Sequence, residues 1–357
     1  MITFLIINAI LLGAALILLV AEKFLVTYGE CSIDINGEKH IGVLGGDNLL
    51  SYLNMNKVFI PSACGGKATC GFCKLKVLSG AGKILPTEQV YISKEEQAEG
   101  IRLACQVKVK QDVEIFIPEY LLSAEEFALE VLDIKELTHD IKEVKMKILN
   151  SKKISFSPGQ YIQFKIPGTD EYRAYSVASP PYIDDNIELT IRLVPGGLCS
   201  TYVHKGLEKS DKLTFTGPFG DFYLREDTDR DIIAIAGGCG MAPIRSIIYH
   251  LAKKGMPRKL FYFFGARTKK DLFYTEELRE IERKYPNFKY IPALSEPIRH
   301  DKWEGDVGLI TQVAEKYIDE KRENEAYLCG PPPMIDAAAK VLTRKGVLPE
   351  NIYYDKF

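Results

Sequence analysis

Hydrophobic and polar positions follow several different patterns along the chain. Residues 2–21 form one run of twenty positions without a charge, and a helix of that length spans the roughly 30 Å hydrocarbon core of a bilayer. Residues 31–43 alternate on both sides of Asn36-Gly37, a dipeptide that favours a hairpin turn. Residues 231–236 are apolar almost throughout, as in a buried strand. The patterns therefore predict a membrane anchor, a sheet-rich body and an α/β region.

The first run has two interpretations, a retained anchor and a cleaved signal peptide. A signal peptide begins with a basic region and has a shorter apolar core before its cleavage site. No Lys or Arg precedes this run, and Glu22-Lys23 follows it directly. We therefore predict a single-pass anchor over residues 1–22. Because Lys23 and Lys39 follow the span, the remaining domains are expected in the cytoplasm, at the inner (plasma) membrane.

Two regions beyond residue 120 have contrasting predicted architectures. Short alternating strands separated by turns indicate an antiparallel barrel, and they cover residues 143–149, 160–166 and 187–194. After the apolar strand at 231–236, a glycine turn leads into a helix that ends near Lys254. This order of strand and helix then repeats, with strands at 260–265 and 327–329 and a helix at 275–284. The repetition is typical of a parallel sheet in an α/β domain.

Composition narrows the class of protein without selecting its chemistry. Lys and Arg number 46 and Asp and Glu 48, so the net charge is −2, which argues against a general nucleic-acid-binding protein. Hydrophobic residues at 46% and charged residues at 26% are typical of packed globular domains. The eight cysteines are too few for a disulfide-built secreted scaffold, yet four of them fall in the segment from Cys64 to Cys105.

Those four cysteines have a spacing that indicates a metal site. They follow the pattern C-x5-C-x2-C-x31-C, formed by Cys64, Cys70, Cys73 and Cys105. Glycines beside the first three remove the Cβ atoms that would crowd a loop whose amides turn toward sulfur. A [2Fe–2S] cluster requires four thiolates. Zinc, the first alternative, usually takes two C-x2-C pairs, whereas this chain has one. Structural thiols without a metal are the second alternative.

The predicted barrel contains residues suited to a flavin. Arg173-Ala-Tyr175-Ser176 offers a cation for phosphate, an aromatic plane and a hydroxyl for the ring nitrogens, although ordinary strand surface would also explain it. Alternation puts Arg173 and Tyr175 on one face of the strand and Ser176 on the other. The segment from Gly197 to Ser200 opens a predicted helix whose N-terminal amides can hold a diphosphate. With the turn at 217–220, these residues favour a flavin site.

The α/β region contains two segments suited to a nicotinamide dinucleotide. The turn after its first strand can present backbone amides to a pyrophosphate, although the full G-x-G-x-x-G spacing is absent, and it holds Gly238, Gly240 and Pro243. Cys329-Gly330-Pro331 ends the last predicted strand, where open α/β sheets bind ligands. A small core residue is the alternative for Cys329. Cys239 is either a thiol near the hydride site or, the favoured interpretation, a compact residue that fills the turn.

These motifs resemble known families. Residues 63–77 and 84–109 are similar to the ferredoxin domain in the F-subunit family of sodium-translocating NADH:quinone oxidoreductases. Within them, Pro86-Thr-Glu88 and Ser93-Lys-Glu-Glu96 also fit capped, solvated helix starts. The R-x-Y-S, G-x-x-S and G-P-x-G motifs resemble the ferredoxin–NADP reductase superfamily. The resemblance implies a β-grasp ferredoxin domain over residues 30–118, an FAD-binding antiparallel barrel over 125–226 and an NADH-binding α/β domain over 229–357.

The resemblance also implies roles for individual residues. The cluster ligands would be Cys64, Cys70, Cys73 and Cys105. The flavin residues would be Arg173, Tyr175, Ser176, Gly197 and Ser200, and the nicotinamide residues Gly238, Gly240, Pro243, Gly330 and Pro331. Three side chains would act near the reacting atoms, namely Ser176, Cys329 and Phe357. The C-terminal Phe357 would stack on the flavin where the nicotinamide enters, and a frayed terminus is its alternative.

A linear electron path is the function that this resemblance implies. NADH gives up two electrons as a hydride, an iron–sulfur cluster accepts one at a time, and FAD handles both. We expect a membrane-anchored NADH dehydrogenase subunit that passes electrons through [2Fe–2S] to a quinone-reducing complex of the sodium-translocating type, with other subunits as partners and no nucleic acid. The alternatives are the reductase component of an oxygenase, such as phenol hydroxylase reductase, which is normally soluble, and a tethered electron carrier with a non-catalytic flavin lobe.

Two local features refine this expectation. Only twelve residues separate Gln160 from Arg173, where the sodium-pump protein carries a longer insertion, so contacts of that insertion are not carried over. Residues 265–270 resemble NADH-using relatives, although Arg267, Lys269 and Lys270 could also bind a 2′-phosphate. We expect NADH to be preferred over NADPH.

Overall fold

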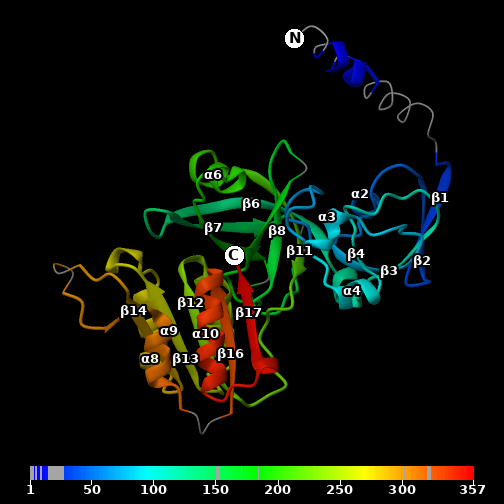
Figure 1. Cartoon of the computed structure of the whole chain (residues 1–357). Helices are drawn as coiled ribbons and strands as arrows, with labels where there is room; N and C mark the ends of the chain where they lie inside the picture. Colours follow the sequence, from blue (N-terminus) through cyan, green and yellow to red (C-terminus); the bar gives the residue numbers. More distant parts are fainter. Residues whose placement is uncertain are drawn as a thin grey trace. The chain divides into compact units, whose positions relative to one another are not determined.

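The structure, a computed structural model, describes residues 4, 6–8, 10–14, 28–149, 153–169, 171–183, 185–298, 300, 302–319 and 323–357. The chain divides into two compact units, Met1–Leu122 and Ser123–Phe357, which are described separately (Figure 1). Over the described residues, no helix combines the length and the apolar character needed to cross a membrane. Most of the anchor predicted over residues 1–22 lies outside the described residues.

A mixed sheet of five strands forms the first unit, in the order β2-β1-β5-β3-β4. The strands are β1 (Glu30–Ile35), β2 (Lys39–Leu44), β3 (Lys74–Ser79), β4 (Ile101–Leu103) and β5 (Val113–Phe116). The short helices are α2 (Leu49–Met55), α3 (Pro86–Gln89), α4 (Lys94–Ala98) and α5 (Glu119–Leu122). The hairpin predicted around Asn36-Gly37 is confirmed, because β1 pairs antiparallel with β2 and both turn residues have positive φ, 59° and 72°.

The second unit begins with an antiparallel barrel of six strands, in the order β10-β7-β6-β11-β8-β9. The strands are β6 (Glu125–Glu136), β7 (Ile141–Ile148), β8 (Tyr161–Lys165), β9 (Tyr172–Ser176), β10 (Asn186–Arg192) and β11 (Lys212–Phe219), and the helix α6 (Leu198–Lys205) precedes β11. The bridge between Val177 and Leu189 joins the two end strands and closes the barrel. The predicted strands and the predicted barrel are therefore confirmed.

A parallel sheet of six strands forms the rest of the unit, in the order β15-β14-β13-β12-β16-β17. The strands are β12 (Asp231–Gly237), β13 (Leu260–Ala266), β14 (Phe288–Leu294), β15 (Asp306–Val307), β16 (Asn324–Gly330) and β17 (Ile352–Lys356). The helices are α7 (Met241–Lys253), α8 (Thr275–Lys284), α9 (Ile310–Tyr317) and α10 (Pro332–Arg344), with single 3₁₀ turns η1 (Gly238–Gly240), η2 (Lys269–Asp271) and η4 (Pro349–Asn351). The predicted α/β domain is confirmed.

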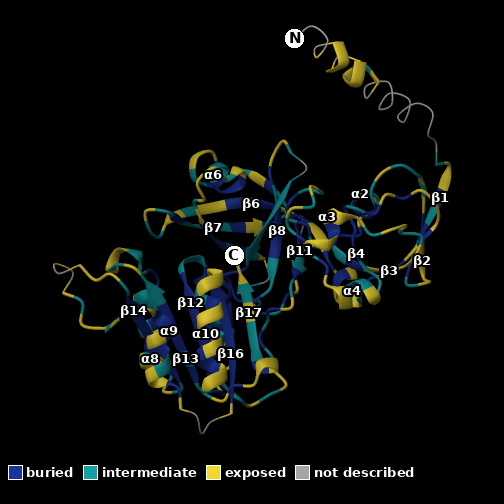
Figure 2. Ribbon diagram, in the orientation of Figure 1, coloured by how far each residue is buried: buried dark blue, intermediate teal, exposed yellow. Residues whose placement is uncertain are grey.

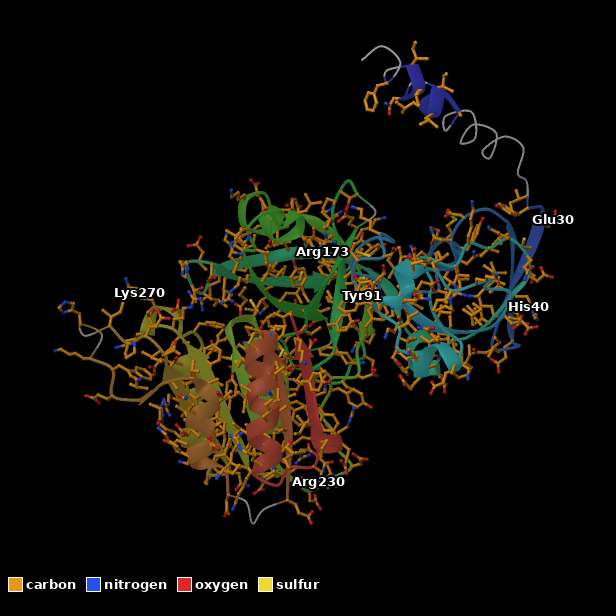
Figure 3. All side chains as sticks on the ribbon, viewed as in Figure 1. Glu30, His40, Tyr91, Arg173, Arg230 and Lys270 are labelled. Atoms are coloured by element: carbon orange, nitrogen blue, oxygen red, sulfur yellow. The ribbon has the colours of Figure 1, made fainter. Side chains whose placement is uncertain are left out.

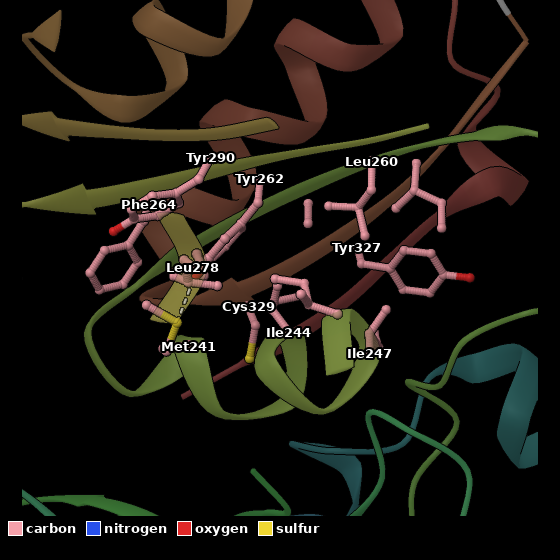
Figure 4. Packing of buried hydrophobic residues seen from close by; sticks show 14 of the residues in the cluster. Met241, Ile244, Ile247, Leu260, Tyr262, Phe264, Leu278, Tyr290, Tyr327 and Cys329 are labelled. Atoms are coloured by element: carbon pink, nitrogen blue, oxygen red, sulfur yellow. Dashed lines mark hydrogen bonds between the residues drawn. The ribbon is translucent and has the colours of Figure 1, made fainter. Parts of the chain in front are cut away.

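Helices cover both faces of this sheet, which explains the apolar run in β12. Ile232 and Ala234 pack into one core with α7 and α8, whereas Ile233 and Ile235 pack into a second core with α9 and α10. Figure 2 shows the sheet as buried and the outer sides of the helices as exposed, and Figure 4 shows the first core. Full burial of one such aliphatic side chain contributes about 1.5–3 kcal/mol. The two cores hold the strand ends, and the turns that follow them, in fixed positions.

Candidate functional site

The four predicted ligand cysteines come together as two neighbouring pairs. The Sγ atoms of Cys64 and Cys70 lie 3.4 Å apart. A hydrogen bond with the Cys73 thiol lowers the pKa of Cys105 to about 7, and the same contact raises the pKa of Cys73. The Cys70 thiol adds to that rise, so the two pairs are close to each other. The structure thus brings Cys105 to the loop that carries the other three.

Backbone amides of the loop face these sulfurs. The N–H groups of Lys67 and Thr69 approach Cys64. The chain can turn in this way because Gly66 has φ of 85°, a left-handed conformation that residues with a Cβ adopt at a cost. A Cβ on Gly71 would lie 2.6 Å from the ring of Tyr91, which Figure 3 labels. The loop therefore depends on glycine for its shape and for its packing.

Paired thiols fit two iron atoms better than one metal ion. A structural zinc needs four ligands around one centre. A [2Fe–2S] cluster divides its four thiolates between two irons. The arrangement of the cysteines therefore favours the cluster over zinc.

A buried ion pair fixes the segment that leads to Cys105. Arg102 on β4 donates to Glu88 at 2.6 and 2.8 Å, and Glu88 also accepts the amide of Leu103. Burial opposes the charge of Glu88, but these bonds lower its pKa below the ordinary value. The predicted solvated helix start is therefore wrong at Glu88, whose exposure is 0%. The capping box predicted at Ser93 is confirmed by its reciprocal bonds with Glu96.

Strand β9 carries three of the predicted flavin residues. Arg173 donates to Glu171 at 2.8 Å. Burial raises the pKa of Tyr175, and its hydroxyl contacts the Cys199 thiol of α6. Ser176 Oγ lies 3.5 Å from Asp355 Oδ2 on β17. Arg173 and Tyr175 thus make their contacts within the barrel domain, while Ser176 contacts the α/β domain.

The start of α6 presents free backbone amides. Gly197 occupies the N-cap and provides no side-chain cap, so the amides of the first turn keep their capacity for a ligand. The Ser200 hydroxyl makes a local contact in this structure. Its hydroxyl is buried and accepts the amide of Val194 at 3.1 Å. Ser200 therefore stabilises the turn that precedes the helix, and its contact with a flavin diphosphate stays a prediction.

A cavity of about 510 Å³ lies at the carboxyl ends of the parallel strands. Gly238 and Pro331, two of the predicted nicotinamide residues, line it. The chain continues to opposite sides from β12 and β16, and open α/β sheets bind ligands at such a reversal. Arg192 and Arg267 also line the cavity, Arg192 in an ion pair with Asp140 at 3.1 Å, and guanidinium groups are suited to bind a pyrophosphate. Sequence reasoning missed Arg192, since it ends a barrel strand and belongs to no motif.

Other predicted nicotinamide residues are buried behind the cavity. A Cβ on Gly240 would lie 2.0 Å from the carbonyl oxygen of Cys329, so the turn after β12 touches β16 directly. Gly330 has φ of 149°, and a Cβ there would meet Met334 at 2.7 Å. Pro243 is buried in the first turn of α7. These residues shape the wall of the cavity through packing.

Four side chains meet where the barrel adjoins the sheet, and we call them the junction group: Ser176, Asp355, Cys239 and Cys329. Burial raises the pKa of Asp355 to about 6, and the hydrogen bond from Ser176 opposes the rise. Burial, with Asp355 and Cys239 nearby, raises the pKa of the fully buried Cys329. Burial also raises the pKa of Cys239 to about 12, so this thiol stays protonated at neutral pH. Sequence reasoning missed Asp355, although it lies within the C-terminal segment already singled out.

Phe357 follows β17 at the same end of the sheet. Its amide donates to the Gly330 carbonyl at 3.3 Å, and its side chain is 55% exposed. Because β17 pairs in parallel with β16, the backbone here continues a ladder up to Lys356. The backbone of Phe357 is therefore held at the carboxyl end of the sheet, where the cavity also lies.

Three domain families match the chain. The "2Fe-2S iron-sulfur cluster binding domain" covers residues 33–110, the "Oxidoreductase FAD-binding domain" residues 128–223 and the "Oxidoreductase NAD-binding domain" residues 234–340. The chain carries domains for FAD, NADH and a [2Fe–2S] cluster, as predicted.

Relatives also match along almost the whole chain. It is 37% identical to the F subunit of the Na(+)-translocating NADH-quinone reductase of Neisseria meningitidis, over 98% of this chain and 97% of that one, and 37% identical to the same protein of Pseudoalteromonas atlantica, with equal coverage. Among solved structures, a cytochrome P450 reductase of Amycolatopsis has a TM-score of 0.75 at 29% identity, and a ferredoxin reductase in carbazole 1,9a-dioxygenase has 0.71 at 27%. Each covers 92% of this chain, which covers 98% of each.

Proposed function

Because the chain belongs to the F-subunit family of Na(+)-translocating NADH-quinone reductases, we propose that it is the NADH-oxidising subunit of such a complex. Electrons enter from NADH, reach FAD and leave through the [2Fe–2S] cluster toward quinone, by way of other subunits. One observation carries this assignment. Gly238 lines the cavity, and the next residue, Cys239, belongs to the junction group with Ser176, so the nucleotide cavity adjoins the flavin strand.

The chain's own residues would bind and orient the reactants. Bound FAD supplies the step between two-electron and one-electron chemistry. Arg173 and the amides at the start of α6 would hold its diphosphate, while Arg192 and Arg267 would hold that of NADH. Ser176 would direct its hydroxyl toward the flavin ring. Asp355, with a pKa of about 6, would exchange a proton with the Ser176 hydroxyl. Phe357 would cover the flavin until the nicotinamide enters.

Membrane anchoring by the first residues is part of the proposal. The described large apolar side chains in this segment are all more than half exposed, namely Phe4, Ile6, Ile7, Ile10, Leu11 and Leu12. Side chains of this kind gain about 25 cal/mol for each Å² that leaves water. A bilayer would cover them, with the two units in the cytoplasm at the inner membrane.

The reductase component of an oxygenase is the second candidate. It is favoured by the similarity to the cytochrome P450 reductase and the dioxygenase ferredoxin reductase, which extends over both units. Purification of the full chain from membranes separates the two functions. We expect it to co-purify with other membrane subunits and to reduce quinone with NADH. Recovery as a lone soluble protein that reduces an oxygenase would contradict the proposed complex.

FAD, not FMN, is the flavin that we expect to recover. The uncapped amides at the start of α6 and the cation of Arg173 suit a diphosphate, and FMN would leave part of this binding capacity unused. Denaturation of the purified protein followed by chromatography of the released flavin identifies it. Recovery of FMN in stoichiometric amount would refute the expectation.

We also expect NADH to be used with kcat/KM at least about tenfold above that for NADPH, a difference of about 1.4 kcal/mol. Asp271 lines the cavity together with Arg267, and its carboxylate accepts the Thr268 amide at 2.9 Å. A fixed negative charge repels a 2′-phosphate. Steady-state kinetics with both dinucleotides measure the ratio, and Asp271→Asn should narrow it. A ratio near one in the unaltered protein would contradict this prediction.

A further inference from the structure

The side-chain amide of Gln106 lies against the sulfur of Cys105. Gln106 Nε2 is 3.8 Å from Cys105 Sγ and donates to the Cys105 carbonyl oxygen at 3.2 Å. The amide of Gln106 itself is bonded to the Leu103 carbonyl at 2.8 Å, which keeps the residue in the turn after β4. An N–H donor therefore stands next to one of the four proposed ligand sulfurs.

Thr87 determines which end of the Gln106 amide faces the sulfur. Its hydroxyl donates to Gln106 Oε1 at 2.8 Å, so the oxygen is held away from Cys105 and Nε2 is turned toward it. Thr87 lies in α3 beside Glu88, whose buried pair with Arg102 at 2.6 Å holds α3 to β4. The turn after β4 thus carries the ligand and the donor, and α3 carries the group that orients the donor.

From this geometry we infer that Gln106 raises the reduction potential of the cluster by donating an N–H···S hydrogen bond to Cys105, and that Thr87 is the positioning residue for this donor. The inference rests on the proposed role of Cys105 as a cluster ligand. One electron is added on reduction, and the negative charge on the sulfurs grows. A hydrogen bond to a more negative acceptor is stronger. The donor therefore stabilises the reduced form more than the oxidised form, and no proton or further reactant is needed.

Redox titration of the full-length holoprotein, followed by the EPR signal of the reduced cluster, measures this effect. Gln106→Leu removes the donor at similar side-chain size. We expect the equilibrium constant for reduction to fall on the order of tenfold, which is about 59 mV toward lower potential for one electron. Thr87→Val should shift the potential in the same direction by less, because the amide remains but loses its orientation. Gln89→Leu, the same change at an exposed position of α3, is the control and should leave the potential unchanged.

The outcomes separate this inference from the proposed function. An unchanged potential in Gln106→Leu, with the cluster fully loaded, overturns the inference and leaves the proposed function intact. If Gln106→Leu loads no cluster, Gln106→Met decides, because it is uncharged, has a similar length and has no donor for Cys105. A potential in Gln106→Met equal to or above that of the unaltered protein refutes the inference. Absence of any cluster from the unaltered protein would instead contradict the proposed function.

Discussion

Replacing Cys70 with serine is expected to abolish electron transfer from NADH to quinone and to leave the reduction of FAD by NADH intact. The substitution removes one of the four proposed thiolates. Cys64, whose sulfur lies 3.4 Å from that of Cys70, then loses the other thiol of its pair. The loss should exceed the roughly 10–100-fold effect that outer-sphere changes have on metal sites. The flavin and nicotinamide residues belong to a separate compact unit, so they should be unaffected. Stopped-flow reduction of the flavin and steady-state quinone reduction measure the two steps.

A matched control is available in the same unit. Cys31 is a buried free thiol whose Sγ lies 3.8 and 3.9 Å from the carbonyl oxygens of Tyr28 and Gly29. Cys31→Ser should retain quinone reduction and the cluster absorbance. In Cys70→Ser, ferricyanide should still be reduced, because it can take electrons from the flavin. Full quinone reduction by Cys70→Ser would mean that electrons leave from the flavin, and the linear path would be wrong.

Gly240→Ala should destabilise the second unit and weaken NADH binding together. The added methyl would lie 2.0 Å from the Cys329 carbonyl oxygen and 2.5 Å from its carbon, and backbone atoms cannot turn aside as a side chain can. Overpacking of this kind costs about 1–3 kcal/mol or more. The φ of −60° at Gly240 suits alanine, so the effect comes from the contact alone. The melting temperature should fall by roughly 5 °C or more, and isothermal titration should show weaker NADH binding.

Gly206→Ala is the corresponding control. Its added methyl would meet the Tyr202 ring at 3.4 Å, an ordinary contact, and it lies in the same unit at the end of α6. We expect its melting temperature and its NADH affinity to stay close to those of the unaltered protein. If Gly240→Ala behaved in the same way, the turn after β12 would have space for a methyl group that the structure does not show. The proposed role of Gly240 in shaping the cavity would then be wrong.

Local patterns were enough to predict the elements whose periodicity is simple. The strands β7, β10 and β12 could be found because alternation or continuous burial is visible within a few residues. Helix α10 was missed, because it begins at Pro332-Pro333, where proline fits the first turn but looks like a break in the sequence. Strand β17 was missed as a strand, because an edge strand of five residues at the end of the chain has little pattern of its own. Its pairing with β16 is visible only in the fold.

The residues of the site likewise divide into those that a local motif predicts and those that only the fold brings together. The cysteines could be assigned because their spacing and adjacent glycines form one compact motif. Arg192 and Asp355 could not, because each acts on residues far away in the sequence: the Arg192 side chain lies over Gly238, and Asp355 faces Ser176. Glu88 was expected in solvent because its capping position is typical of an exposed helix start. Only the folded unit brings Arg102 next to Glu88, and the two then form a buried ion pair.

Another buried pair joins the barrel to the α/β domain. Arg245 of α7 donates to Glu188 of β10 at 2.7 Å and to the Ala178 carbonyl at 3.3 Å, and only 8% of Arg245 is exposed. Loss of one partner from a buried pair costs about 3–5 kcal/mol, whereas replacement of both by apolar residues is often neutral. In evolutionary terms, positions 188 and 245 should therefore covary. Lineages that lose the glutamate should also lose the arginine, and the two domains should be inherited, exchanged and transplanted between proteins as one piece.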